Sequence, residues 1–273
     1  MAIVAVTGSF DNLRSRHVRF LEAASKLGSV HVALWPDETV QSLTGTPSRL
    51  PEQERLYLLQ SLRYVDGVTL VRGNIVPDSL PDLGAVQPQI WVVNEAGDTP
   101  ARRASAEARG IQYRVIEEAG LGGFPVPPVT ASSIDTSRKR VMVTGCYDWF
   151  HSGHVRFFEE ASALGDLCVV VGHDANIRLL KGKGHPLLPQ AERLYMVQAV
   201  RHVRYAMIST GHGWMDAEPE VALVEPHFYV VNEDGDKPEK KAFCAAHGIE
   251  YVVLKRIPKE GLPRRESTDL RGF

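Results

Sequence analysis

Two histidines one helical turn apart stand out in the second half of the chain, in the stretch His151-Ser152-Gly153-His154. The apolar run Val141–Val143 and a turn from Thr144 to Asp148 precede them. A glycine turn between a parallel strand and a helix would place both imidazoles near the helix start, where free backbone N–H groups and the helix dipole favour a phosphate. Gly153 would let that phosphate approach the backbone. Imidazoles aimed at one phosphorus can donate hydrogen bonds to oxygens that gain charge. Metal ligation and a capped helix end are the alternatives.

A pair of lysines, Lys181 and Lys183, flanks a glycine ahead of Pro189 and Glu192-Arg193. Such a cationic loop can neutralise the charge of a bound phosphate group. Solvated surface is the alternative. The sequence has no Walker-type Gly-x-x-x-x-Gly-Lys-Ser/Thr motif, which disfavours a P-loop NTPase.

Carboxylates and cysteines complete the set of candidate groups. Asp148 and Asp174 are candidates for contact with a substrate or metal, and turn-forming aspartates are the alternative. Cys146 could be reactive, although a small buried residue is favoured. The other cysteines, Cys168 and Cys244, do not complete a metal-ligand spacing. The cysteines therefore indicate a reducing compartment and no disulfide framework.

The elements that must position these residues follow from the alternation of short β-branched runs with longer amphipathic segments. We therefore expect an α/β fold in which each half is a parallel sheet flanked by helices. In the second half the expected strands are Arg140–Val143, Leu167–Val171, Tyr205–Ser209, Phe228–Val231 and Tyr251–Leu254. The expected helices lie near His154–Leu164, Gln190–Val200, Glu218–Glu225 and Pro238–Ala246.

The first half repeats the second at a nearly constant spacing. Arg14 matches His151 at 137 residues, and Asn94 matches Asn232 at 138. A match over this length indicates a full-domain duplication rather than a short solenoid repeat. The expected domains are residues 1–130 and 139–273, joined by a linker at 131–138.

The first copy lacks the groups that phosphate chemistry needs. Arg14 stands in place of His151, and Thr44 and Thr46 stand near the positions of Lys181 and Lys183. A triphosphate would lack its counter-charges there. We therefore expect residues 1–130 to be an inactive structural or regulatory pseudo-domain.

Composition restricts the partners. A formal net charge of -2 gives no reason to expect binding to nucleic acid or to an anionic membrane. The apolar runs, such as Val169–Val171, are too short to span a bilayer, and no basic stretch precedes a long apolar segment at the N-terminus. These features predict a cytoplasmic protein without membrane insertion.

Five motifs together resemble the cytidylyltransferases of the HxGH nucleotidyltransferase superfamily, with the nearest likeness to the ethanolamine-phosphate, choline-phosphate and glycerol-3-phosphate enzymes. The motifs are Thr144–Asp148, His151–His154, Lys181–Lys183, Glu192-Arg193 followed by Arg201-His202-Val203, and Ser267–Leu270. The resemblance implies two tandem Rossmann-like nucleotidyltransferase domains. It also implies transfer of CMP from CTP to a small phosphorylated alcohol, with pyrophosphate released and Mg²⁺ bridging triphosphate oxygens.

The resemblance further implies roles for individual residues, with no metal site made by the protein. His151, His154 and Lys181 would be catalytic. The nucleotide-binding residues would be Thr144, Gly145, Cys146, Tyr147, Gly153, Lys183, Arg201, Ser267 and Thr268. The second substrate would contact Asp148, Asp174 and Trp214, and core packing is the alternative for the tryptophan.

Two positions depart from the family pattern: Arg204 stands where an acidic residue is usual, and Glu266 where a small hydroxyl residue is usual. Arg264 and Arg265 are candidate substitutes for the usual phosphate-binding arginine. Three functions stay open: the CTP-dependent transferase, an ATP-dependent adenylyltransferase acting on a sugar phosphate, and a non-catalytic nucleotide-binding protein. The two halves are expected to form an intramolecular pseudo-dimer about a pseudo-twofold axis, with a homodimer as a further option.

Overall fold

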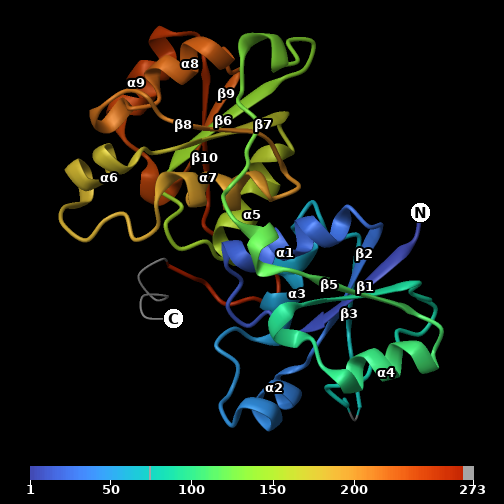
Figure 1. Ribbon diagram of the computed structural model, residues 1–273. Coiled ribbons are helices and arrows are strands. Elements are labelled where there is room, and N and C mark those ends of the chain that lie inside the picture. Colours follow the sequence, from blue (N-terminus) through green and yellow to red (C-terminus); the bar gives the residue numbers. More distant parts are fainter. Residues whose placement is uncertain (74, 267–273) are drawn as a thin grey trace. The chain divides into compact units, whose positions relative to one another are not determined.

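The structure is a computed structural model that describes residues 1–73 and 75–266. The chain divides into two compact units, Met1–Gly123 and a second unit that begins at Phe124. Each unit contains one parallel five-stranded sheet with flanking helices, which confirms the expected α/β fold (Figure 1). We describe each unit by itself.

The first unit alternates strands and helices along the chain. Its strands are β1 (Ile3–Gly8), β2 (Ser29–Leu34), β3 (Gly67–Leu70), β4 (Ile90–Asn94) and β5 (Gln112–Ile116). Its α-helices are α1 (Ser15–Ser25), α2 (Asp37–Thr44), α3 (Glu52–Gln60) and α4 (Pro100–Ala108).

The second unit follows the same alternation. Its strands are β6 (Arg140–Gly145), β7 (Asp166–Val171), β8 (Val203–Ile208), β9 (Phe228–Asn232) and β10 (Glu250–Leu254). Its α-helices are α5 (Ser152–Ser162), α6 (Asp174–Lys181), α7 (Gln190–Gln198), α8 (Glu218–Val224) and α9 (Pro238–Ala246).

The two sheets have the same strand order. It is β3-β2-β1-β4-β5 in the first unit and β10-β9-β6-β7-β8 in the second, which is the same order in reverse direction when β6 to β10 are matched with β1 to β5. The chain leaves β6 toward β7 on one side and later returns to β9 on the other. In open parallel sheets, ligands bind at such a switch point, beyond the carboxyl ends of the strands. The turn after β6 opens at this point.

Both faces of the second sheet are buried, which explains its almost continuous β-branched runs. Met142 packs in one hydrophobic cluster, while Val141 and Val143 pack in another. This alternation follows from the two-residue period of a strand. The central strand is therefore held from both sides, and the turn at its carboxyl end starts from a rigid support.

The secondary structure differs from expectation in two places. A helix, α6, covers Asp174–Lys181, where no helix was expected, and Lys181 is its last residue rather than part of a loop. The expected linker at 131–138 belongs to the second unit, where Ile134 is buried in the core and the backbone N–H of Asp135 donates to the Tyr205 hydroxyl at 3.0 Å. The observed division between the units lies earlier, at Gly123 and Phe124.

Within the described residues, no helix has both the length and the apolar character needed to cross a membrane.

Candidate active site

The turn after β6 is tightly packed. Tyr147 adopts a positive φ of 54°, which L residues other than asparagine and aspartate rarely adopt, and its side chain is buried. A Cβ atom on Gly145 would lie 2.7 Å from the Tyr147 ring, so only glycine fits there. The Tyr147 ring in turn meets His154 edge to face, with ring centroids 5.3 Å apart. The turn thus fixes one side of the second histidine.

The two histidines lie together at the start of α5. His151 is the N-cap residue, and its Nδ1 accepts a hydrogen bond from the backbone N–H of Gly153 at 3.1 Å. The neutral ring therefore carries its proton on Nε2. The rings of His151 and His154 stack with centroids 3.9 Å apart. A Cβ atom on Gly153 would lie 2.9 Å from the His151 ring, so the glycine also makes room for the imidazole.

His154 is held in its neutral form. Burial is the main cause that places its pKa well below 6.5, and the positive charges of Arg256 and Lys181, together with His151, act in the same direction. Its Nδ1 atom is buried and has no hydrogen-bond partner within the described part of the chain. At neutral pH the ring can therefore offer one N–H donor to a phosphate oxygen.

A cavity of about 250 Å³ opens at this point. Its walls come from the turn after β6, the start of α5, the end of α6, and the segment from the end of β9 into α9. The lining residues include Thr144, Gly145, Cys146, Tyr147, Asp148, His154, Lys181, Asn232 and Lys240. Lys181 is the last residue of α6, and Gly182 follows with a φ of 83° that ends the helix. The helix thus brings a cation to the cavity that holds His154.

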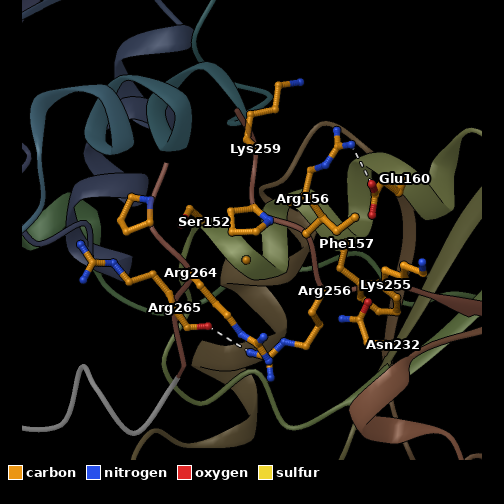
Figure 2. A pocket seen from close by; sticks show the side chains of 14 residues that line it. Ser152, Arg156, Phe157, Glu160, Asn232, Lys255, Arg256, Lys259, Arg264 and Arg265 are labelled. Atoms are coloured by element: carbon orange, nitrogen blue, oxygen red, sulfur yellow. Dashed lines mark hydrogen bonds and ion pairs between the residues drawn. The ribbon is translucent and has the colours of Figure 1, made fainter. Parts of the chain in front are cut away.

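A basic pocket lies beside the cavity and shares Phe157 and Asn232 with it. Figure 2 shows its cationic side chains, which are Arg156, Lys255, Arg256, Lys259, Arg264 and Arg265. Ser152 and Gly153 also line it, so the pocket reaches the start of α5. Clustered cations favour a polyanion, and the dipole of α5 adds to this preference at the N-terminal end of the helix.

Arg256 connects the pocket with the histidines, although the sequence analysis did not select it. Its guanidinium pairs with Asp234 at 2.8 Å. It also donates to the backbone carbonyl of Arg265 at 3.0 Å (Figure 2). Its charge also contributes to the low pKa of His154. The available signal was its place two residues beyond β10, at the edge of the sheet where the other site residues lie.

Comparison with known proteins places this geometry in a family. The cytidylyltransferase-like family model matches residues 142–259. An FAD synthase from Methanocella paludicola is 44% identical over 135 residues, which cover 48% of this chain and 93% of that protein. The chain belongs to the cytidylyltransferase-like family. The matched region contains the histidine pair and Lys181.

Two further proteins that match the chain are longer than it. The bifunctional protein HldE from Methylococcus capsulatus is 39% identical over 98 residues, 35% of this chain and 20% of that protein. HldE from Pelobacter propionicus is 26% identical over 235 residues, 72% of this chain and 46% of that protein. The chain thus spans less than half the length of these two relatives. The relatives found are HldE and FAD synthase proteins, which corrects the expected nearer likeness to ethanolamine-phosphate, choline-phosphate and glycerol-3-phosphate cytidylyltransferases.

Two carboxylates expected at the site of this cytidylyltransferase-like chain have partners in its framework. Both carboxylate oxygens of Asp148 accept from the backbone N–H of Leu187, and one also accepts from Leu188, at 2.7 to 2.8 Å. Asp174 pairs with the fully buried Arg193 at 2.7 Å. Both carboxylates therefore stabilise the local backbone, as the structural alternative expects. Their contact with a substrate stays a prediction. Cys146 is half-buried and lines the cavity, and burial raises the pKa of its thiol.

Several other expected site residues do not line the cavity. Arg201 lies in the turn before β8, at the amino edge of the parallel sheet, whereas the cavity opens at the carboxyl edge. Lys183 is exposed in the loop after α6. Trp214 is 47% exposed, so core packing does not explain it. Ser267 and Thr268 lie outside the described residues.

The cavity does not present a ready metal site. No group of three or more His, Cys, Asp and Glu side chains within residues 1–73 and 75–266 could hold a metal ion. Of the carboxylates that line the cavity, Asp148 is bonded to backbone amides and Asp234 is paired with Arg256.

Proposed function

We propose that the second unit is a nucleotidyltransferase that moves a nucleoside monophosphate from a nucleoside triphosphate to the phosphate of a small phosphorylated acceptor. An acceptor phosphate oxygen attacks the α-phosphorus, the bond between the α-phosphorus and the bridging oxygen breaks, and pyrophosphate leaves. The observation that carries the proposal is the stacked pair His151 and His154 at the start of α5, with Lys181 in the same cavity as His154 and Arg256 in the adjoining basic pocket.

This arrangement suits the reaction because the acceptor phosphate is already an anion and needs no general base. The protein must align two anions and neutralise the charge that moves onto the leaving group. Neutral His154 donates a hydrogen bond without adding a charge that would hold the product. Lys181 and the basic pocket supply the counter-charges. Mg²⁺ would enter with the triphosphate as part of the substrate, bridging its oxygens.

We propose ATP as the donor. FAD, the product named for several relatives, contains an adenine nucleotide, and the FAD synthase from Methanocella paludicola matches nearly its whole length. CTP is the second candidate, because the motifs of residues 144–154 and 181–193 resemble those of CTP-dependent enzymes. We propose that the first unit takes no part in the chemistry, since Arg14 and Thr44 stand at the positions of His151 and Lys181.

Pyrophosphate release tests the proposal. Purified full-length chain is assayed with Mg²⁺ and either ATP or CTP, against FMN, sugar phosphates, glycerol 3-phosphate, phosphocholine and phosphoethanolamine. The expected result is turnover with ATP and at least one acceptor, lost in His151→Ala and retained in the matched first-unit variant Arg14→Ala. Turnover with CTP but not with ATP would mean that CTP is the donor. Absence of turnover with every pair, despite nucleotide binding, would overturn the enzymatic proposal in favour of a non-catalytic nucleotide-binding protein.

A further inference from the structure

Lys240 is an unusual cation in the cavity wall. It lies in the first turn of α9, two residues after Pro238, where the helix begins. It lines the cavity that holds His154 and Lys181. A positive side chain near a helix N-terminus opposes the helix dipole. Burial is the main cause that lowers its pKa, and Lys237 adds to the effect. Both observations mean that this ammonium group is placed at a cost to the folded protein.

The described residues do not compensate that cost. Within residues 1–73 and 75–266, the one hydrogen bond of the Lys240 side chain is long, from Nζ to the backbone carbonyl of Gly235 at 3.5 Å. Lys240 has no ion pair with any carboxylate in the described part of the chain. Asp216 and Asp234 act on it only at longer range, and each is engaged elsewhere, Asp216 by the Ser209 hydroxyl at 2.6 Å and Asp234 by Arg256.

The first unit shows the same position with its partners in place. Arg102 lies at the matching position in α4, 138 residues earlier. Its guanidinium donates to the carbonyls of Pro77 at 3.1 Å and Gly97 at 2.6 Å, and it pairs with Asp78 at 3.4 Å. Gly97 and Asp78 match Gly235 and Asp216 of the second unit at the same spacing.

The difference between the two positions points to a ligand. In the first unit, Arg102 is bound by partners from the same unit. In the second unit, Lys240 lines a cavity, and most of its hydrogen-bonding capacity is unused. A buried or half-buried charge needs an opposite charge or several hydrogen bonds to be tolerated. An anionic ligand group at Lys240 would supply both.

We propose that Lys240 binds the phosphate group of the acceptor. This inference rests on the proposed function and gives the two substrates different cations: Lys181 and the basic pocket bind the triphosphate, and Lys240 binds the acceptor. The acceptor phosphate supplies the attacking oxygen, so that a bond forms from this oxygen to the α-phosphorus while pyrophosphate leaves. Lys240 holds the remaining acceptor oxygens and exchanges no proton in this step.

Steady-state kinetics with the fastest donor and acceptor pair of the pyrophosphate assay test the assignment. In Lys240→Met the KM for the acceptor is expected to rise roughly 10- to 100-fold, the cost of losing a charged hydrogen bond, with the KM for the triphosphate within twofold of wild type. Lys240→Arg should recover most of the acceptor affinity. Arg102→Met is the matched control and should leave both KM values unchanged. A rise in the triphosphate KM, or no change in either, would overturn the assignment.

A binding measurement separates this inference from the proposed function. Inorganic phosphate is titrated calorimetrically into wild type, Lys240→Met and Lys240→Arg, each saturated with Mg²⁺ and an ATP analogue whose α–β bridge is a methylene group. Phosphate should bind wild type and Lys240→Arg, and bind Lys240→Met at least tenfold more weakly. Equal binding by all three would refute the role of Lys240 whether or not turnover is found. Failure of turnover with normal phosphate binding would refute only the proposed reaction.

Discussion

The starts of α1 and α5 have the same framework but different chemistry. Phe10 and Tyr147, at matching positions, both take a positive φ, of 48° and 54°. Asp11 accepts from the backbone amides of Arg49 and Leu50 in the same way that Asp148 accepts from Leu187 and Leu188. The first unit therefore keeps the strained turn and the carboxylate that fixes the following loop, although it lacks the histidine pair. These two features belong to the fold rather than to the site.

The side chains at the two helix starts differ. At the start of α5 the Nδ1 of His151 accepts from the Gly153 amide, whereas at the start of α1 the Nδ1 of His17 accepts from the backbone N–H of Arg14 at 3.0 Å. The second histidine of the pair is thus kept in the first unit, but as a cap of its own helix. The framework alone therefore does not distinguish the two units, whereas the residues at positions 151 and 181, His and Lys in the second unit but Arg14 and Thr44 in the first, do.

The largest expected effect concerns the shared framework. Arg193 is fully buried and donates to the carbonyls of Leu188, Cys146 and Gly172, and Arg55 makes matching bonds in the first unit. Each arginine replaced by alanine should lower the free energy of unfolding of its unit by about 3 to 5 kcal/mol, because buried acceptors lose their donors. Chemical denaturation followed by circular dichroism measures this.

The two arginine variants sharpen the comparison when they are measured together. Similar losses in Arg193→Ala and Arg55→Ala would support a purely structural role in both units. A much smaller loss in Arg193→Ala, combined with lost turnover, would instead show that this arginine acts at the site.

The next largest effect concerns chemistry alone. His154→Ala should lower kcat by roughly 10²- to 10³-fold, because one preorganised donor to the reacting phosphate is removed. His17→Ala, the matching change in the first unit, should leave kcat unchanged. Pyrophosphate release measures both, with thermal unfolding as a check that each variant is folded. Equal loss of kcat in the two variants would contradict a silent first unit.

Much of this framework could be predicted from the sequence. The β-branched runs located all strands of the second unit within two residues, and Pro238–Ala246 was predicted with its observed bounds. Helix α6 was missed because its eight residues are short for a periodic pattern, although Lys181 and Gly182 mark its end. The partner of Asp148 lies 39 residues away, which a local pattern does not reveal. Arg256 was missed for the same reason, since only the sheet brings β10 beside α5.

The pH dependence of stability tests the retained histidine of the first unit. Burial, followed by the charges of Arg16 and Arg14, lowers the pKa of His17 from 6.5 to about 4. Below pH 6.5 the unfolded chain binds a proton that the folded chain does not, so the free energy of unfolding should fall as the pH drops from about 6.5 to about 4. Below about pH 4 this contribution should change no further, and the total loss of unfolding free energy should be about 3 kcal/mol or less.

The variant His17→Gln isolates this contribution, because glutamine can still accept at the same helix position but does not titrate. The difference in unfolding free energy between wild type and variant should change with pH only between about 4 and 6.5. A difference that is constant over this range would mean that His17 is charged in the folded protein.

The smallest expected effect concerns the glycine between the histidines. A methyl group at Gly153 would lie 2.9 Å from the His151 ring, so in Gly153→Ala that ring must move away from its stack with His154. The backbone itself is not in a glycine-only conformation, and unfolding should change by about 1 kcal/mol or less. Misplacement of one donor should lower kcat roughly 10-fold, with the triphosphate KM changed less.

In the first unit Arg16 occupies this position with a full side chain, because no imidazole at position 14 needs the space. Arg16→Gly should therefore be silent in the same assay, and an unchanged kcat in Gly153→Ala would show that the observed stacking of the two rings is not needed for the reaction.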